Sequence, residues 1–63
     1  MLRVLREVAA GTLTWSRMDY RRADGTPATR QVLALRRHGL MLPAGYGPDA
    51  VTVAGRLALE SAP

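Results

Sequence analysis

Helical spacing of apolar residues is clearest near the start of the chain. Val4, Leu5 and Val8 fall on one arc of a helical projection, and charged residues fall on the opposite arc. Gly11 follows at the position where a left-handed residue commonly ends a helix. The pattern predicts a first helix over residues 2–10.

A second helix is predicted over residues 27–38. Thr26 is a favoured N-cap, and Pro27 suits the first helical position because an N–H there would have no intrahelical partner. Gly39 ends the helix, and Leu40 sits where a side chain can fold back onto the last turn. The inner face is expected to carry Ala28, Val32 and Leu35, and the outer face Arg30, Ala34 and Arg37.

The segment 12–25 fits two patterns. Leu13 and Trp15 alternate with polar neighbours, which favours a short strand over residues 12–15. A short capped helix that runs to about Arg22 is the alternative. We expect a short strand or extended stretch followed by one or two helical turns, with Trp15 packed in the core.

The last third of the chain predicts a β-hairpin and a helix. Two apolar triplets, 40–42 and 51–53, flank a connector rich in Gly and Pro that carries Tyr46 at its centre. Thr52 can then cap a last helix over residues 53–61. The inward-facing residues expected there are Val53 or Ala54, with Leu57 and Ala58.

Length and composition limit the class of protein. Sixty-three residues, 48% of them apolar and 22% charged, fit one small globular domain over residues 1–63 and not a disordered segment. The absence of cysteine excludes disulfides and thiolate chemistry, and the single histidine, His38, gives no zinc cluster. The five acidic residues are scattered singly, so no carboxylate pair is spaced for acid–base catalysis. We therefore expect neither an enzyme nor a cofactor or metal site.

The charge distribution points to an anionic partner. All nine basic residues are arginine, and the formal net charge is +4. Residues 17–37 contain six arginines and two aspartates, so the net charge of this segment, 6 − 2 = +4, equals that of the whole chain. The codon usage of a GC-rich genome accounts for arginine in place of lysine, but not for this clustering. Nucleic acid is the first candidate partner, and an acidic protein surface or a membrane the second.

Two short motifs resemble those of small bacterial winged helix-turn-helix regulators. The third helix of these proteins commonly ends in Leu-x-x-x-Gly-Leu, here Leu35-Arg-Arg-His-Gly39-Leu40. Their wing is commonly followed by a Leu-Thr-x-x-Gly-Arg-x-x-Leu helix start, here Val51-Thr-Val-Ala-Gly-Arg-Leu-Ala-Leu59. The similarity covers residues 27–60. It implies a small α+β, winged-helix-like domain: helix, short strand or turn, helix, β-hairpin wing and C-terminal helix.

The same resemblance implies a transcriptional regulator, of phage or prophage type among others, that binds double-stranded DNA through the helix 27–38. Arg30 is expected to pair with guanine O6 and N7 in the major groove, while Thr29 and Gln31 read adjacent base edges. Arginines at the helix end and in the preceding loop are expected to neutralise phosphates. These are Arg36, Arg37, Arg21 and Arg22.

A protein-interaction module is the alternative reading. It would use the arginine-rich face or the Tyr46 tip to bind a partner protein, and the absence of a cation from that tip favours it. A chain this short gains stability from a second copy, so we also expect a homodimer. The apolar residues proposed to pair across its two-fold axis are Leu2, Leu5, Leu57 and Leu59.

No targeting segment is recognisable in the sequence. Arg3, Arg6 and Glu7 interrupt the one stretch that resembles a signal or membrane-spanning run. We therefore expect a cytoplasmic protein with no membrane partner.

Overall fold

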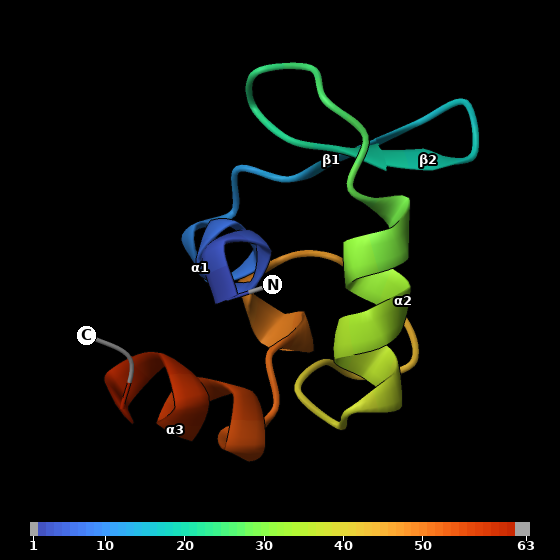
Figure 1. Ribbon diagram of the computed structural model, residues 1–63. Coiled ribbons are helices and arrows are strands. Elements are labelled where there is room, and N and C mark those ends of the chain that lie inside the picture. Colours follow the sequence, from blue (N-terminus) through green and yellow to red (C-terminus); the bar gives the residue numbers. More distant parts are fainter. Residues whose placement is uncertain (1, 62–63) are drawn as a thin grey trace.

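A computed structural model describes residues 2–61 as a small α+β fold (Figure 1). Three α-helices surround the core, and one antiparallel hairpin lies above the N-terminal end of α2. The elements in chain order are α1 (Leu2–Ala10), β1 (Thr14–Ser16), β2 (Asp19–Arg21), α2 (Thr29–Arg37), the 3₁₀ turn η1 (Pro48–Ala50) and α3 (Val53–Ser61).

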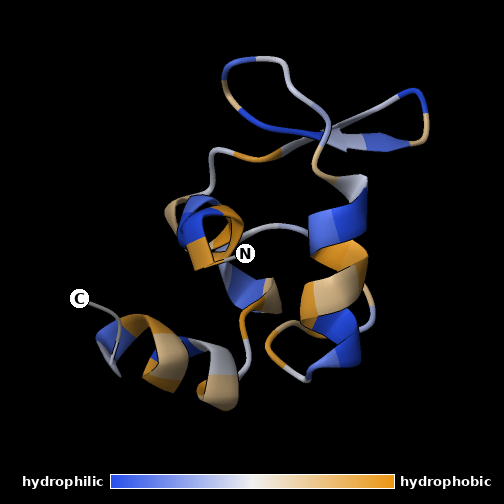
Figure 2. Ribbon diagram, in the orientation of Figure 1, coloured by the Kyte–Doolittle hydropathy of each residue, from blue (hydrophilic) through white to orange (hydrophobic). Residues whose placement is uncertain are grey.

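The core lies between α1, α2 and η1. Leu5, Val8, Val32 and Leu35 are fully buried, which confirms the inner faces predicted for the first two helices. Burial of each such side chain contributes about 1.5–3 kcal/mol. Figure 2 shows hydrophilic residues near both ends of α2 and hydrophobic residues between them. The remaining buried apolar residues are Val4, Leu13, Ala28, Met41, Ala50 and Val51.

The segment after α1 forms a β-hairpin, so the predicted helical turns are wrong. Trp15 pairs with Tyr20 across the two strands. The connecting residues Arg17 and Met18 have φ values of +50° and +67°. Positive φ at both central residues defines a two-residue I′ turn, for which Asn-Gly is the usual sequence signal. Positions 17 and 18 carry neither asparagine nor glycine, so the local sequence does not predict the turn.

The prediction of a core position for Trp15 is also wrong. The strand begins at Thr14, one residue after Leu13 enters the core. Trp15 lies on the hairpin with 46% of its surface exposed, and its ring centroid is 4.7 Å from that of Tyr20. The side chain therefore stabilises the hairpin surface and not the interior.

The start of α2 is held by the hairpin instead of the predicted Thr26 cap. The Thr26 hydroxyl donates to Asp24 Oδ1 at 2.7 Å, and the helix begins after Ala28, whose N–H donates to the carbonyl of Tyr20 at 2.7 Å. The hydrogen bonds from the Thr26 hydroxyl and N–H lower the pKa of Asp24. At the other end, Leu40 N–H donates to the carbonyl of Leu35, as the predicted glycine-terminated helix end requires.

The predicted hairpin over 40–53 is reduced to one isolated bridge between Met41 and Val51. The N–H of Leu42 donates to the carbonyl of Ala50 at 2.8 Å, and beyond that pair the chain leaves the ladder. Pro43 and Pro48 have no N–H to donate, which prevents regular strands from extending into the connector. The wing expected after α2 is therefore a closed loop that contains η1.

Thr52 caps α3 as predicted, because its hydroxyl accepts the N–H of Gly55 at 3.0 Å. The predicted orientation of the helix is wrong: Val53 and Leu57 are 77% and 57% exposed. Gly55 is buried instead, and a Cβ there would collide with the carbonyl oxygen of Leu40. This close approach turns the Gly55 side of α3 toward the body of the protein.

Candidate nucleic-acid interface

One face of α2 is left uncovered by the fold. We call it the outer strip of α2 and define it by Arg30, Leu33, Ala34 and Arg37, which follow the i, i+3, i+4, i+7 spacing of a single helix face. It lies opposite the buried residues Val32 and Leu35. The strip ends in two exposed arginines about 10 Å apart along the helix axis.

The two arginines of the outer strip are available to an external anion. Within residues 2–61, neither Arg30 nor Arg37 forms an ion pair or a hydrogen bond through its guanidinium. α2 contains three arginines and no acidic residue, so no carboxylate on the helix neutralises them. The predicted outer position of Arg30 and Arg37 is thus confirmed.

Arg36, predicted to contact phosphate, is built into the fold. Its Nη2 donates to the Tyr20 hydroxyl and to the carbonyl of Gly45, each at 2.8 Å. Its guanidinium carbon also lies 5.2 Å from the centroid of the Tyr20 ring, within range of a cation–π contact. Arg36 thus joins α2 to β2 and to the 40–51 loop, and we leave it out of the interface.

Two arginines, one on β2 and one at its exit, are paired with acids. Arg22 Nε lies 2.7 Å from Glu7 Oε1, which joins the hairpin exit to α1. Arg21 lies 3.6 Å from Asp19 Oδ2 and donates to the carbonyl of Gly25 at 2.9 Å. Both guanidinium groups therefore have less free charge for a phosphate than Arg30 and Arg37.

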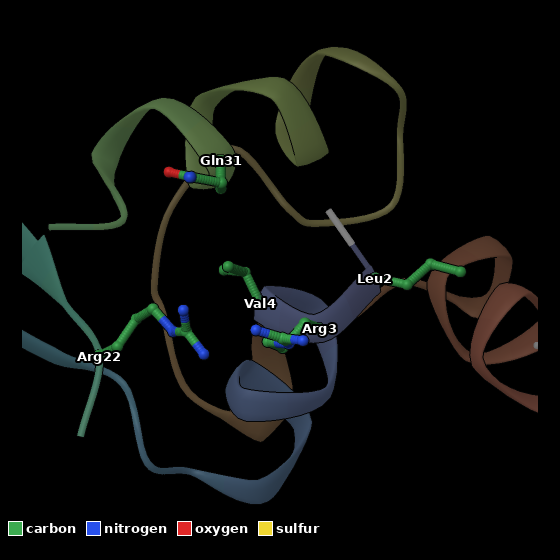
Figure 3. Close-up of a pocket in the computed structure, with 5 residues that line it drawn as sticks. All are labelled: Leu2, Arg3, Val4, Arg22 and Gln31. Atoms are coloured by element: carbon green, nitrogen blue, oxygen red, sulfur yellow. The ribbon is translucent and has the colours of Figure 1, made fainter. Parts of the chain in front are cut away.

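Thr29 and Gln31, the predicted base-reading neighbours of Arg30, lie in different surroundings. The Thr29 hydroxyl accepts the N–H of Tyr20 at 3.1 Å and donates to Asp19 Oδ1 at 3.3 Å, so it fastens α2 to β2. Gln31 is exposed and lines an open hollow of about 590 Å³ between α1 and α2 (Figure 3). Arg3 and Arg22 line the same hollow, so only Gln31 of this pair faces a polar, solvent-accessible surface.

The apolar residues predicted for a partner surface divide into three groups. Leu5 is buried in the core and is unavailable, which corrects its assignment to an interface. Leu2 and Leu59 are half-buried against the core, and Figure 3 shows Leu2 pointing from α1 toward α3. Leu57 is exposed. The fifth candidate, Tyr46, packs its ring against Tyr20 with a centroid distance of 5.7 Å.

The hairpin tip was missed by the sequence analysis. Arg17 is exposed, and Met18 is 81% exposed, the most of any large apolar side chain in residues 2–61. The only usable signal was the spacing of Thr-Trp-Ser and Asp-Tyr-Arg, two strand-like triplets separated by two residues.

Neither the described residues 2–61 nor the comparisons with known proteins identify a class of ligand for this protein. Within residues 2–61, no cluster of three His, Asp or Glu side chains is arranged to hold a metal ion, and no helix has the length and hydropathy to cross a membrane. Comparison of the chain with protein-family models, with curated proteins and with solved structures finds no match.

Proposed function

We propose that this protein binds double-stranded DNA through the outer strip of α2, in transcriptional regulation or a related architectural task. The observation that carries the proposal is a pair of exposed arginines, Arg30 and Arg37, on a helix with no acidic residue; neither has an ion-paired partner within residues 2–61. A helix of this diameter fits the major groove of B-DNA, which is about 12 Å wide. The winged-helix resemblance is part of this proposal and supports the same helix as the DNA-contacting element.

The two ends of the strip have different roles in the proposal. Arg30 lies in the first turn of α2 on the outer strip, where a guanidinium fork can reach base edges. Gln31 lines the hollow between α1 and α2 and is not part of the strip. Arg37 lies in the last turn and neutralises a backbone phosphate. Leu33, exposed between them, offers an apolar contact such as a thymine methyl group accepts.

Fluorescence anisotropy with a labelled random-sequence duplex tests the proposal. We expect binding at low salt that Arg30→Ala with Arg37→Ala weakens strongly, because two phosphate or base contacts are lost. Arg56→Ala is the matched control: it removes one cation from α3 and leaves α2 intact, so it should weaken binding less than Arg37→Ala alone. Absence of binding at low salt, or equal losses for Arg37→Ala and Arg56→Ala, would reject the proposal.

A protein-interaction role is the second candidate, and α3 favours it. Val53 and Leu57 are one helical turn apart on the same face, and both are more than half exposed. Two exposed apolar side chains on one helix face provide a small surface that a protein partner can cover. A second copy of the chain is the occupant we propose, with the two α3 helices related by a two-fold axis.

A further inference from the structure

The turn of the β1–β2 hairpin presents a cation and an apolar side chain side by side. Arg17 and Met18 are its two central residues, and both are exposed. Within residues 2–61 the guanidinium of Arg17 has no hydrogen-bonded or ion-paired partner. Trp15, 46% exposed, lies on β1 close behind the turn. The tip of the hairpin therefore carries an exposed apolar side chain, Met18, next to the positive charge of Arg17, which has no partner within residues 2–61.

Arg17 and Met18 are not the residue types that this turn conformation favours. Both positions have positive φ, a region that glycine and asparagine occupy far more readily than arginine or methionine. Strained positions of this kind cluster at sites that contact ligands. Asn-Gly would form the same turn with less strain, so the long side chains of Arg17 and Met18 need a reason outside the hairpin.

Hydrogen bonds at Tyr20 hold the hairpin against α2 and the residue before it. The N–H of Ala28 donates to the carbonyl of Tyr20 at 2.7 Å, the Thr29 hydroxyl accepts the N–H of Tyr20 at 3.1 Å, and Arg36 donates to the Tyr20 hydroxyl at 2.8 Å. The turn is therefore held in a set position relative to the helix. In Figure 1 the turn extends past α2 on the side that faces away from α1. The outer strip lies opposite the buried residues Val32 and Leu35 and so also faces away from the core.

We propose that the hairpin turn enters the minor groove of the duplex whose major groove α2 occupies, with Met18 as a wedge between two base pairs. This inference rests on the proposed function and names the second contact of the same site. Apolar side chains, methionine among them, unstack base steps in this way and kink the duplex. Arg17 beside the wedge contacts the minor-groove floor or the flanking phosphates, where the potential is most negative in A·T-rich sequence.

The proposal predicts a preference that α2 alone does not give. Pyrimidine–purine steps such as TA unstack most easily, so a duplex with a TA step beside the α2 site should bind more tightly and bend more than one with a GC-rich flank. Trp15 is the sole tryptophan of the chain and lies on β1, three residues before Met18. Its emission therefore reports contact at the turn and not at the outer strip of α2.

The decisive variant is Arg17→Asn with Met18→Gly, because it keeps the turn and removes both side chains. Three properties are measured with the full chain: duplex affinity by anisotropy, duplex bending by energy transfer between dyes at its two ends, and Trp15 emission. We expect at least about tenfold weaker binding, equivalent to about 1.4 kcal/mol, together with loss of bending and of the Trp15 change. Met18→Leu is the control; it keeps an apolar wedge and should retain the bend.

The outcomes separate this inference from the proposed function. If Arg30→Ala with Arg37→Ala abolishes binding while the turn variant binds and bends DNA like the wild type, the outer strip stands and the wedge is rejected. If no duplex binds at low salt, both are rejected. The last experiment measures Trp15 emission with vesicles of phosphatidylserine and phosphatidylcholine. A change in Trp15 emission with these vesicles, and none with duplex, would assign the turn to a membrane surface and overturn the proposal.

Discussion

At the scale of single residues, Gly55 and Arg36 fix the arrangement of elements that the hydrophobic pattern leaves open. Gly55 lets the backbone of α3 approach the carbonyl of Leu40, and so decides which face of the helix is buried. Arg36 bonds the Tyr20 hydroxyl and the carbonyl of Gly45, and so connects three segments far apart in sequence. Neither role is visible in the sequence, since both depend on partners that only the folded chain brings close.

Gly55→Ala should destabilise the protein, although alanine is normally the better helix residue by about 1 kcal/mol. The added Cβ meets the Leu40 carbonyl and the Val51 side chain, and such overpacking costs about 1–3 kcal/mol. Urea denaturation followed by circular dichroism measures the change. Gly47→Ala is the control, because a Cβ there has open space. Equal stability of Gly55→Ala and wild type would show that α3 does not pack as described.

Arg36→Ala and Arg37→Ala test the division between a structural and a functional arginine. Loss of the two Arg36 hydrogen bonds leaves the Tyr20 hydroxyl and the Gly45 carbonyl without this donor, which we expect to cost about 1–3 kcal/mol. Arg37→Ala should stay within about 0.5 kcal/mol of the wild type, as exposed substitutions usually do. Thermal unfolding compares the two, and a larger loss for Arg37→Ala would reverse the assignment.

At the scale of elements, helices were predicted better than strands. The spacing of Val4, Leu5 and Val8 is local and sufficient, and it placed α1 at its observed bounds. The inner face of α2 and the Thr52 cap of α3 followed in the same way. The β1–β2 hairpin was missed because its turn carries Arg17-Met18 in a conformation that neither residue favours. The candidate residues follow the same division: the outer strip of α2 was predictable from the sequence, and the exposed turn of the hairpin was not.

The strain at the hairpin turn has a direct thermodynamic consequence. Each left-handed residue other than glycine costs roughly 1–2 kcal/mol. Arg17→Asn with Met18→Gly should therefore raise the midpoint of thermal unfolding. Thr14→Ala, a substitution in β1 outside the turn, is the comparison and should not raise it. A lower midpoint for the turn variant would mean that Arg17 and Met18 stabilise the hairpin through contacts of their own.

At the scale of the whole molecule, the chain is compact but offers little core. Its Cα radius of gyration of 10.5 Å matches the value of about 10.6 Å expected for a globular domain of this length. The hairpin lies at one end and α3 at the other, and α2 runs from the hairpin toward the level of α3 (Figure 1). The exposed residues of the outer strip of α2 and the exposed residues Val53 and Leu57 of α3 belong to different helices.

Leu57→Glu tests the self-association proposed for α3. A nine-residue helix provides a small interface, so we expect a dimer only at high protein concentration. Leu57→Glu places a charge in the middle of the exposed apolar face and should leave a monomer at every concentration. Sedimentation velocity measures this, with Ala23→Glu in an exposed loop as the control. A wild type that stays monomeric at millimolar concentration would rule out the α3 pairing.

The salt dependence of duplex binding tests the central proposal most directly. Each phosphate neutralised by the protein contributes about −0.9 to the slope of log K against log salt concentration. Arg30→Ala with Arg37→Ala removes the phosphate contact assigned to Arg37 and should flatten the slope by about 0.9, whereas Arg56→Ala should leave it unchanged. A slope that is the same for all three proteins would contradict the assignment of the outer strip of α2 as the DNA-binding surface.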